Sequence, residues 1–256
     1  MPEHDNFLTL LLEGAKENLE QNAGFIGKSF VAHQPAGWHS FEPIIASACV
    51  IVVILFIARS LRVDLEDLDK SVIPESGLTL RTFMEAFVGY FYDLAKSAMD
   101  AERAKRYFPV IGASALFVFC SNALALVPGM PVPTSNMNVT LGCAMIVFVL
   151  FNIYGIMTQG FIPYFKHMGG PLWYMFPLIF AIEFVSLCVR PFTLALRLMI
   201  NMSVDHLILG IGLSLFPLFL PIPLMLLGII VVLVQTMVFT LLTAIYIGLA
   251  TEREAH

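Results

Sequence analysis

The chain has 256 residues, of which 58% are hydrophobic and 13% are charged, and its mean hydropathy is +0.83. A soluble domain of this size could not cover so much apolar surface with polar groups, so the composition excludes an ordinary soluble enzyme and predicts an integral membrane protein. The net charge of −5 says little, because the charged residues are unevenly spread along the chain.

The first 42 residues begin with an acidic stretch that contains one short apolar patch, FLTLLL. The patch has no basic lead-in, so we expect no cleaved signal peptide. We interpret residues 1–42 as an N-terminal extracytoplasmic segment.

Residues 43–106 are predicted to form a first membrane span, over 43–58, and an amphipathic helix that follows a charged linker. Large apolar side chains recur at helical spacing in this second helix, with charged residues between them. Such a helix is expected to lie on the cytoplasmic membrane surface. Its apolar positions are Phe83, Phe87, Tyr90, Phe91 and Leu94.

Residues 107–170 are predicted to form a helical hairpin, with spans over 107–127 and 139–159. The connection PGMPVPTSNMN has three prolines and no charge, which predicts a turn.

Residues 171–256 contain 80 consecutive, mostly apolar residues, which the segment FPLFLPIP divides into stretches over about 178–213 and 222–250. A helix over the 36 residues of the first stretch would be about 54 Å long. The hydrocarbon core is only about 30 Å thick, so the helix must tilt steeply, bend or break, and Pro191 offers a bend. The fold class is therefore all-α and integral to the membrane, with about five crossing helices, one amphipathic surface helix and a long, strongly tilted C-terminal helix hairpin.

Basic residues predict the orientation. With the N-terminus outside and five spans, the inside segments hold ten Lys or Arg residues and the outside segments hold two, Lys16 and Lys28. Basic residues favour the cytoplasmic side, so we expect the C-terminus to be cytoplasmic. The ten are Arg59, Arg62, Lys70, Arg81, Lys96, Arg103, Lys105, Arg106, Lys166 and Arg253.

The two remaining basic residues, Arg190 and Arg197, lie seven positions apart inside the apolar stretch. Each helical residue turns about 100°, so they are nearly eclipsed on a helix. A charge at the bilayer centre costs about 2.5–3.5 kcal/mol on insertion scales, so both must face protein, water or a partner charge. The same face also holds Glu183, Ser186, Thr193 and Asn201.

Two interpretations of these charges stay open. Glu183 and Arg190 could form an internal ion pair that stabilises helix packing. Arg197 has no well-placed carboxylate in its own chain, which favours a partner on another chain. Asp205 and His206 could touch interfacial water at a helix end, or could be titratable steps in a water-filled access path.

Gly228, Gln235 and Tyr246 fall along one face of the last helix. Gln235 could form an interhelical hydrogen bond to the helix of Arg197, and that role is compatible with lining a path.

Three segments together resemble subunit a of the F-type ATP synthase, the membrane stator half of its proton channel. EFVSLCVRPFTLALRLMINMSVDHL is similar to the family's segment around an essential arginine. LVQTMVFTLLTAIYIGLATE is similar to the family's closing helix, and SNALALVPGMPVPTSNMNVTL to its hairpin.

The resemblance implies roles for single residues. Arg197 is then the essential arginine, Asn201 the motif asparagine, and Gln235 the polar residue that faces them. Glu183 matches a glutamate near the cytoplasmic half-channel, with Ser186 and Arg190 beside it, and His206 stands in the outer half-channel. Asn122, Asn136 and Asn138 match polar positions on the outer side.

Two positions depart from the family pattern. Gly228 stands where some members carry an ionisable residue that pairs with the position of His206, and Ala125 stands where some are acidic. An additional acid, Asp205, precedes His206. We hypothesise that Asp205 supplies the carboxylate that the last helix lacks.

The resemblance also implies partners: a c-ring of small hairpin subunits, the b subunits of the peripheral stalk, the whole ATP synthase and the lipid bilayer. It implies a proton-translocating subunit of the bacterial plasma (inner) membrane that is not catalytic on its own, with its N-terminus outside. We expect no cofactor, no metal and no nucleic acid.

A secondary ion-coupled transporter is the alternative from another class, because it too places charges at mid-membrane in broken helices. Such proteins usually have inverted repeats and more spans. A purely structural scaffold would leave Arg197 beside Asn201 unexplained.

Overall fold

The computed structural model describes residues 38–65, 77, 79–127, 130–160, 164, 176–215 and 221–251. Within these ranges all the regular secondary structure is helical, and no strand occurs. The expected extracytoplasmic segment, apart from its last five residues, lies outside the described residues, as do Lys166 and Arg253.

Six α-helices and two short 3-10 turns make up the described fold. They are α3 (Trp38–Leu65), α5 (Leu80–Ala98), α6 (Ala101–Ala123), η1 (Leu124–Leu126), η2 (Pro133–Ser135), α7 (Met137–Gln159), α9 (Phe176–Leu215) and α10 (Pro221–Ala250).

Five of these helices are long and apolar enough to cross a membrane, which confirms the predicted number of spans. The second begins at Ala101, six residues before the predicted start at 107. The prediction followed hydropathy and so excluded the charged first turn, AERAKR, although Asp100 sits at the N-cap position of the helix. The candidate spans are Glu42–Leu61, Ala101–Leu126, Met137–Gln159, Leu178–Leu215 and Ile222–Ala250.

Helix α9 has 40 residues and runs through Pro191 without a break. At 1.5 Å per residue it is about 60 Å long, roughly twice the thickness of a hydrocarbon core. Helix α10, with 30 residues, is also longer than one perpendicular crossing requires. Both lengths agree with the predicted strongly tilted C-terminal hairpin.

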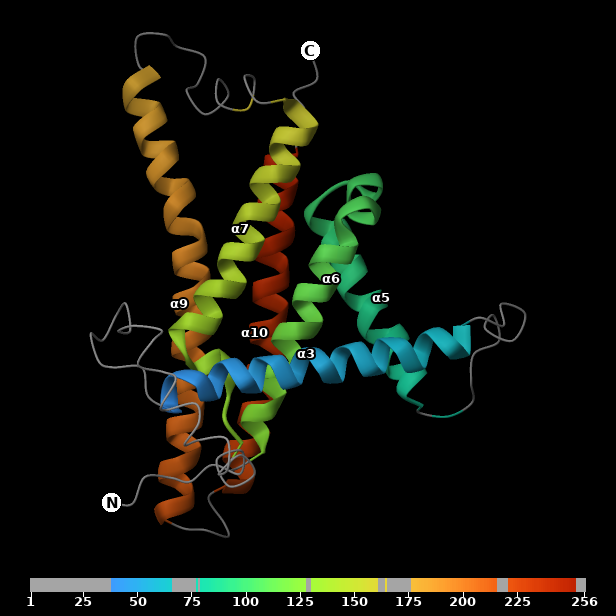
Figure 1. Cartoon of the computed structure of the whole chain (residues 1–256), viewed down its shortest axis with the longest axis vertical. Helices are drawn as coiled ribbons and strands as arrows, with labels where there is room; N and C mark the ends of the chain where they lie inside the picture. Colours follow the sequence, from blue (N-terminus) through green and yellow to red (C-terminus); the bar gives the residue numbers. More distant parts are fainter. Residues whose placement is uncertain are drawn as a thin grey trace.

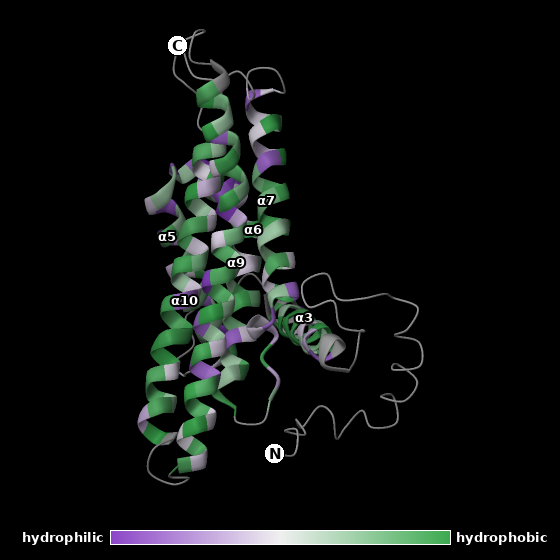
Figure 2. Cartoon of the chain, turned by 90° about the vertical axis from the view of Figure 1, so that its left-hand side faces the viewer, coloured by the Kyte–Doolittle hydropathy of each residue, from purple (hydrophilic) through white to green (hydrophobic). Residues whose placement is uncertain are grey.

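Helix α3 lies across the other long helices. Figure 1 shows α6, α7, α9 and α10 running in broadly the same direction while α3 crosses them, and Figure 2 shows α3 nearly end-on beside the bundle. An apolar helix of this length can stand upright in a bilayer. If α3 does so, α9 and α10 lie at a large angle to the membrane normal, as their lengths require.

Helix α10 is the centre of the bundle and packs against α5, α6, α7 and α9. One buried cluster joins α10 to α9 and α7 around Leu198, Met202 and Phe239, and another joins it to α6 and α7 around Ile111 and Ile247. Since lipid is as apolar as a protein core, close packing and interhelical hydrogen bonds hold such helices together.

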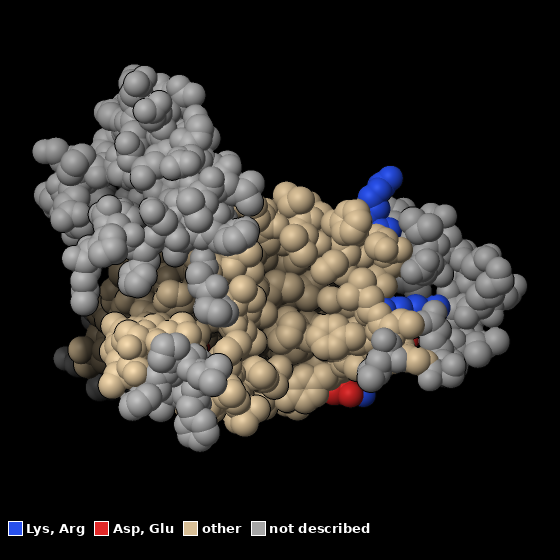
Figure 3. Space-filling view, turned by 90° about the horizontal axis from the view of Figure 1, so that it is seen from below, with Lys and Arg blue, Asp and Glu red and all other residues tan. Residues whose placement is uncertain are grey.

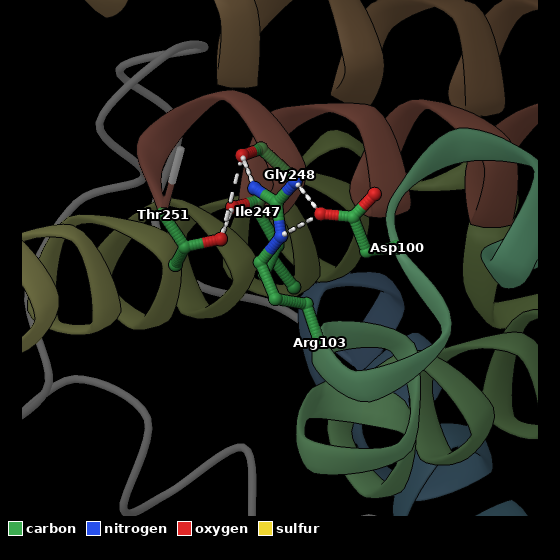
Figure 4. Close-up of polar contacts among 5 residues, drawn as sticks. All are labelled: Asp100, Arg103, Ile247, Gly248 and Thr251. Atoms are coloured by element: carbon green, nitrogen blue, oxygen red, sulfur yellow. Dashed lines mark hydrogen bonds and ion pairs between the residues drawn. The ribbon is translucent and has the colours of Figure 1, made fainter. Parts of the chain in front are cut away.

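The C-terminal end of α10 is held by polar contacts to the start of α6 (Figure 4). Arg103 Nη1 donates to the carbonyl oxygen of Gly248 at 3.2 Å, and Arg103 Nη2 donates to Asp100 Oδ2 at 2.5 Å. Thr251 Oγ1 donates to the carbonyl of Ile247 at 2.7 Å. A cation at a helix C-terminus also interacts favourably with the helix dipole, so Arg103 anchors the last helix to α6.

Helix α5 has the predicted amphipathic pattern. The ring centroid of Phe87 lies 4.6 Å from that of Phe91 on the same helix and 5.1 Å from that of Phe119 on α6. Tyr90 Oη donates to Met237 Sδ of α10 at 3.3 Å. The aromatic stripe therefore packs on α6 and α10, and the placement of α5 on the membrane surface stays a prediction.

Candidate functional site

Helix α9 presents two different faces. Leu194, Leu198 and Met202 are buried against the bundle. Arg197 lies a little more than a quarter of a turn around the helix from Leu198 and is exposed, among large apolar side chains of the same helix such as Ile200 and Val204. Figure 2 shows α9 and α10 as predominantly hydrophobic, with few hydrophilic positions. Arg197 is thus a cation on an apolar surface.

Charge is also scarce on the face of the molecule that Figure 3 shows. Seen from below, the described surface is almost entirely uncharged, and its Lys and Arg atoms gather at one side (Figure 3). Large apolar side chains of α10, including Leu226, Leu233 and Val234, are more than half exposed. Such a surface suits lipid or an apolar partner.

Polar residues of α9 meet α10 at three levels. Asn201 Nδ2 donates to Gln235 Oε1 at 2.7 Å, and Gln235 is only 3% exposed. This is the interhelical hydrogen bond that the sequence suggested. It ties the two helices together one turn beyond Arg197.

The second level is an ion pair. Arg190 Nη2 donates to Glu183 Oε1 at 3.4 Å, and the side chains are 25% and 42% exposed. The Arg190 guanidinium also lies over the Tyr246 ring, 5.5 Å from its centroid. The internal pair considered for Arg190 is therefore present, and Ser186 is exposed on the same helix.

The third level is a contact between Asp205 and the backbone of α10. A Cβ atom added at Gly228 would lie 3.2 Å from Asp205 Oδ2 and 3.1 Å from Leu126 Cδ2. The half-buried Asp205 carboxylate thus occupies space that a larger residue at 228 would need. His206 is exposed and, nine residues after Arg197, falls half a turn away from it on the helix.

Arg197 takes part in none of these three contacts. The two helices are antiparallel, and the register of the neighbouring pairs places the buried Phe239 opposite Arg197. Within the described ranges, Arg197 forms no hydrogen bond and no ion pair. Any partner of this guanidinium therefore lies outside the described residues.

A small cluster of buried polar side chains lies where α6 meets η2. Asn122 is fully buried, and its Oδ1 accepts a hydrogen bond from Thr134 Oγ1 at 2.7 Å. Asn122 Nδ2 and the neighbouring Ser121 Oγ have no partner among the described residues. An unpaired buried group costs about 1–3 kcal/mol, so these atoms are suited to bind water.

The other two asparagines from the sequence analysis lie at the start of α7. Asn136 is its N-cap residue, and its side chain accepts from the backbone N–H of Asn138 at 3.0 Å. Asn138 is exposed. Ser203 Oγ of α9 donates to the carbonyl of Ser135 at 3.1 Å, which links this region to the helix of Asp205.

Sequence reasoning missed Ser121 and Thr134, which join Asn122 in its buried cluster. Small hydroxyl residues are common in membrane helices, and the hydrogen bond of Thr134 joins it to a residue of a separate element, α6. It also missed Tyr164, which follows α7 and packs back on it.

Comparison with known proteins gives a consistent result. The sequence profile of the ATP synthase A chain family matches residues 44–248. The ATP synthase subunit a of Sorangium cellulosum is 54% identical over 256 residues, which is 100% of each chain. That of Geobacter sulfurreducens is 39% identical over 208 residues, 81% of this chain and 84% of the relative. The secondary-transporter alternative is not favoured. The chain therefore belongs to the ATP synthase A chain family, the proton-channel stator of the F-type ATP synthase.

Proposed function

We propose that this chain forms two proton half-channels that are separated by Arg197 and served by carboxylates of a rotating c-ring. The observation that carries the proposal is the isolation of Arg197 on an apolar face, between the Asn201–Gln235 pair and the Glu183–Arg190 pair. A charge in such a place is stable only beside a partner or water. A carboxylate on a neighbouring subunit meets that need.

In this proposal the outer half-channel passes Asn122, Asp205 and Gln235, with His206 near its mouth. The unpaired donors of Ser121 and Asn122 support it, because they can hold water in an otherwise apolar core. A proton that follows this path neutralises a ring carboxylate, which can then turn toward lipid.

The inner half-channel begins at Glu183, with Arg190 and Ser186 beside it. After a rotation, the ring carboxylate releases its proton there. Half-exposure of the Glu183 carboxylate supports this role, because a relay group must reach water.

Arg197 acts as an electrostatic barrier and not as a proton carrier. A guanidinium does not give up its proton in proteins. Its positive charge attracts the ionised ring carboxylate, favours deprotonation as the carboxylate passes, and blocks direct proton leakage between the half-channels. The driving force is about 2.3 kcal/mol per charge for each 100 mV of membrane potential.

Asp205 supplies the outer carboxylate that Gly228 cannot. The position of its carboxylate against the Gly228 backbone supports this assignment, since an acidic side chain at 228 would occupy the same space. The Asp205 carboxylate and the His206 imidazole are both groups that can take up and release a proton.

The placement in the cell is part of the proposal. We infer an N-terminus outside the bacterial plasma membrane, a cytoplasmic C-terminus, contacts to the c-ring and to the b subunits of the peripheral stalk, and no catalytic activity of this chain on its own. The excess of basic residues in the inside segments supports the orientation.

The test uses assembled ATP synthase in inverted membrane vesicles. Arg197→Ala should abolish ATP synthesis driven by a proton gradient, and Arg197→Lys should do so too because an ammonium lacks the planar fork of a guanidinium. Arg59→Ala, which removes an exposed arginine of α3, is the control. Normal coupled synthesis in Arg197→Ala would refute the proposal.

A further inference from the structure

A cleft of about 460 Å³ lies between the end of α5, the start of α6 and the last turns of α10. Helix α5 ends at Ala98 and α6 begins at Ala101, so Met99 and Asp100 alone connect the two helices. A Cβ atom placed on Gly248 would lie 3.4 Å from the carbonyl oxygen of Ala98. Helix α10 therefore packs directly on the α5–α6 turn, and the cleft lies beside this contact.

Two cationic side chains line the cleft, Lys96 from the last turn of α5 and Arg103 from the first turn of α6. Asp100 is the one acid among the described residues that line it, and its carboxylate is paired with Arg103. Arg103 also donates to the carbonyl oxygen of Gly248 (Figure 4). Lys96 is exposed and forms no hydrogen bond or ion pair with any residue that the structure describes. Two positive charges and one negative charge leave the cleft with a net charge of +1, carried by Lys96.

Apolar side chains line another part of the cleft. Ile245 and Leu249 of α10 contribute to it, and Leu249 is 53% exposed. The cleft lies where the candidate span Ala101–Leu126 begins and the candidate span Ile222–Ala250 ends. Its apolar residues thus belong to the end of a span, while its unpaired lysine lies outside both spans. Such an arrangement suits the boundary between hydrocarbon and lipid headgroups.

We propose that this cleft binds an anionic phospholipid of the cytoplasmic leaflet, with the lipid phosphate beside Lys96 and an acyl chain along Leu249. The inference rests on the proposed placement of the C-terminus in the cytoplasm. Anionic lipids give the cytoplasmic leaflet its negative surface potential, and basic pockets between membrane helices on that side bind anionic headgroups.

The charge and the lining together favour this ligand. A lipid phosphodiester carries one negative charge, which balances the net charge of the cleft. A zwitterionic headgroup would bring a second cation near Lys96, so we expect it to bind less tightly. Free phosphate would leave the exposed apolar side chains of α10 uncovered, whereas an acyl chain covers them.

The experiment uses the purified, assembled ATP synthase in nanodiscs of phosphatidylcholine. A small fraction of the lipid is a photoactivatable analogue with a diazirine in its acyl chain and either a phosphoglycerol or a phosphocholine headgroup. Mass spectrometry measures how much of each analogue labels the α10 peptide that contains residues 245–249. The anionic analogue should label it about five times more, the factor that corresponds to about 1 kcal/mol for one lysine near the membrane surface.

Lys96→Gln removes the unbalanced charge and should lower this preference to about one. Lys96→Arg keeps the charge and should retain the preference. The matched control is Lys105→Gln, because Lys105 is an exposed lysine of α6 that does not line the cleft. Its substitution should leave the preference unchanged.

Three results would overturn the inference. One is equal labelling by the two headgroups in the unaltered complex. Another is an equal fall in Lys96→Gln and Lys105→Gln, which would indicate attraction to the basic surface in general. The third is loss of the preference in inorganic phosphate but not in chloride of equal ionic strength, which would identify the ligand as a free ion.

The labelling requires no turnover, so its outcome is separate from the test of the proposed function. A missing lipid preference would leave that function intact. Normal coupled synthesis in Arg197→Ala would remove the proposed function without changing the labelling.

Discussion

The segments of α9 around Arg190 and around Arg197 carry the same residue on nearly the same face, yet they differ in what surrounds the charge. Arg190 has Glu183 on its own helix and the Tyr246 ring on α10. Arg197 falls opposite the buried Phe239 and has neither kind of partner within the described residues. The difference teaches that the register of the neighbouring helix, and not the arginine itself, decides which of the two charges has a partner among the described residues.

The largest effect is expected from replacing Arg197, and replacing Arg190 in parallel tests whether the two arginines differ. Arg197→Ala should lower ATP-driven proton pumping by at least about 100-fold, as the loss of a central electrostatic group does in other sites. Arg190→Ala should lower it less than tenfold, because a partly exposed ion pair contributes only about 0–1 kcal/mol. Fluorescence quenching in inverted vesicles measures both. Equal losses in the two variants would show that the arginines are equivalent.

The next effect concerns the outer carboxylate. Asp205→Asn keeps the shape of the side chain and removes its ability to ionise, so proton flux should fall by about 100-fold or more, as for other acid–base groups. The double variant Asp205→Asn, Gly228→Asp returns a carboxylate to the same space from α10 and should recover part of the flux. Passive proton conduction after removal of the soluble ATPase head gives the readout. Unchanged flux in Asp205→Asn would remove its assigned role.

A smaller effect is expected at the inner glutamate. Glu183→Gln should slow pumping about two- to tenfold without abolishing it, because the half-exposed site still admits water. Rates of pumping at matched enzyme content provide the measurement. A complete loss, equal to that of Arg197→Ala, would mean that Glu183 is essential and not a relay that water can replace.

The smallest effect is structural. Asn201→Leu leaves the buried Gln235 oxygen without its donor and should weaken the α9–α10 pairing by about 0.6–2 kcal/mol. Asn201→Leu combined with Gln235→Leu should recover part of that stability, because no polar atom is then left unpaired. The temperature at which the complex loses this subunit reports the change. A double variant less stable than Asn201→Leu would argue against a simple hydrogen-bond loss.

The sequence was sufficient to predict the spans, the shared face of Arg190, Arg197 and Asn201, and the α10 face of Gln235 and Tyr246. Each follows from helical periodicity within one segment, which short-range geometry determines. The Glu183–Arg190 pair could be considered from the sequence, because seven residues make about two helical turns and bring both side chains to one face. The sequence alone left it as one of two alternatives.

Contacts between segments far apart in sequence could not be predicted in the same way. The direction of α3 is set by its packing against other helices. The sequence does not reveal it, because lipid-facing and protein-facing helices have similar apolar compositions. The return of Tyr164 onto Gly155 depends on a glycine turn at 160 and on the end of α10. The burial of Asn122 with Thr134 depends on a short 3-10 turn between two spans.

Disulfide cross-linking in native membranes tests the central claim most directly, that the Arg197 face of α9 meets a rotor carboxylate. Ile200→Cys and Val204→Cys place thiols on the exposed face beside Arg197, and Leu198→Cys places one on the buried face. With a second cysteine one turn from the ring carboxylate, we expect an oxidant to join the two subunits through positions 200 and 204 and not through 198. Cross-linking through 198 alone, or through none of the three, would contradict the account.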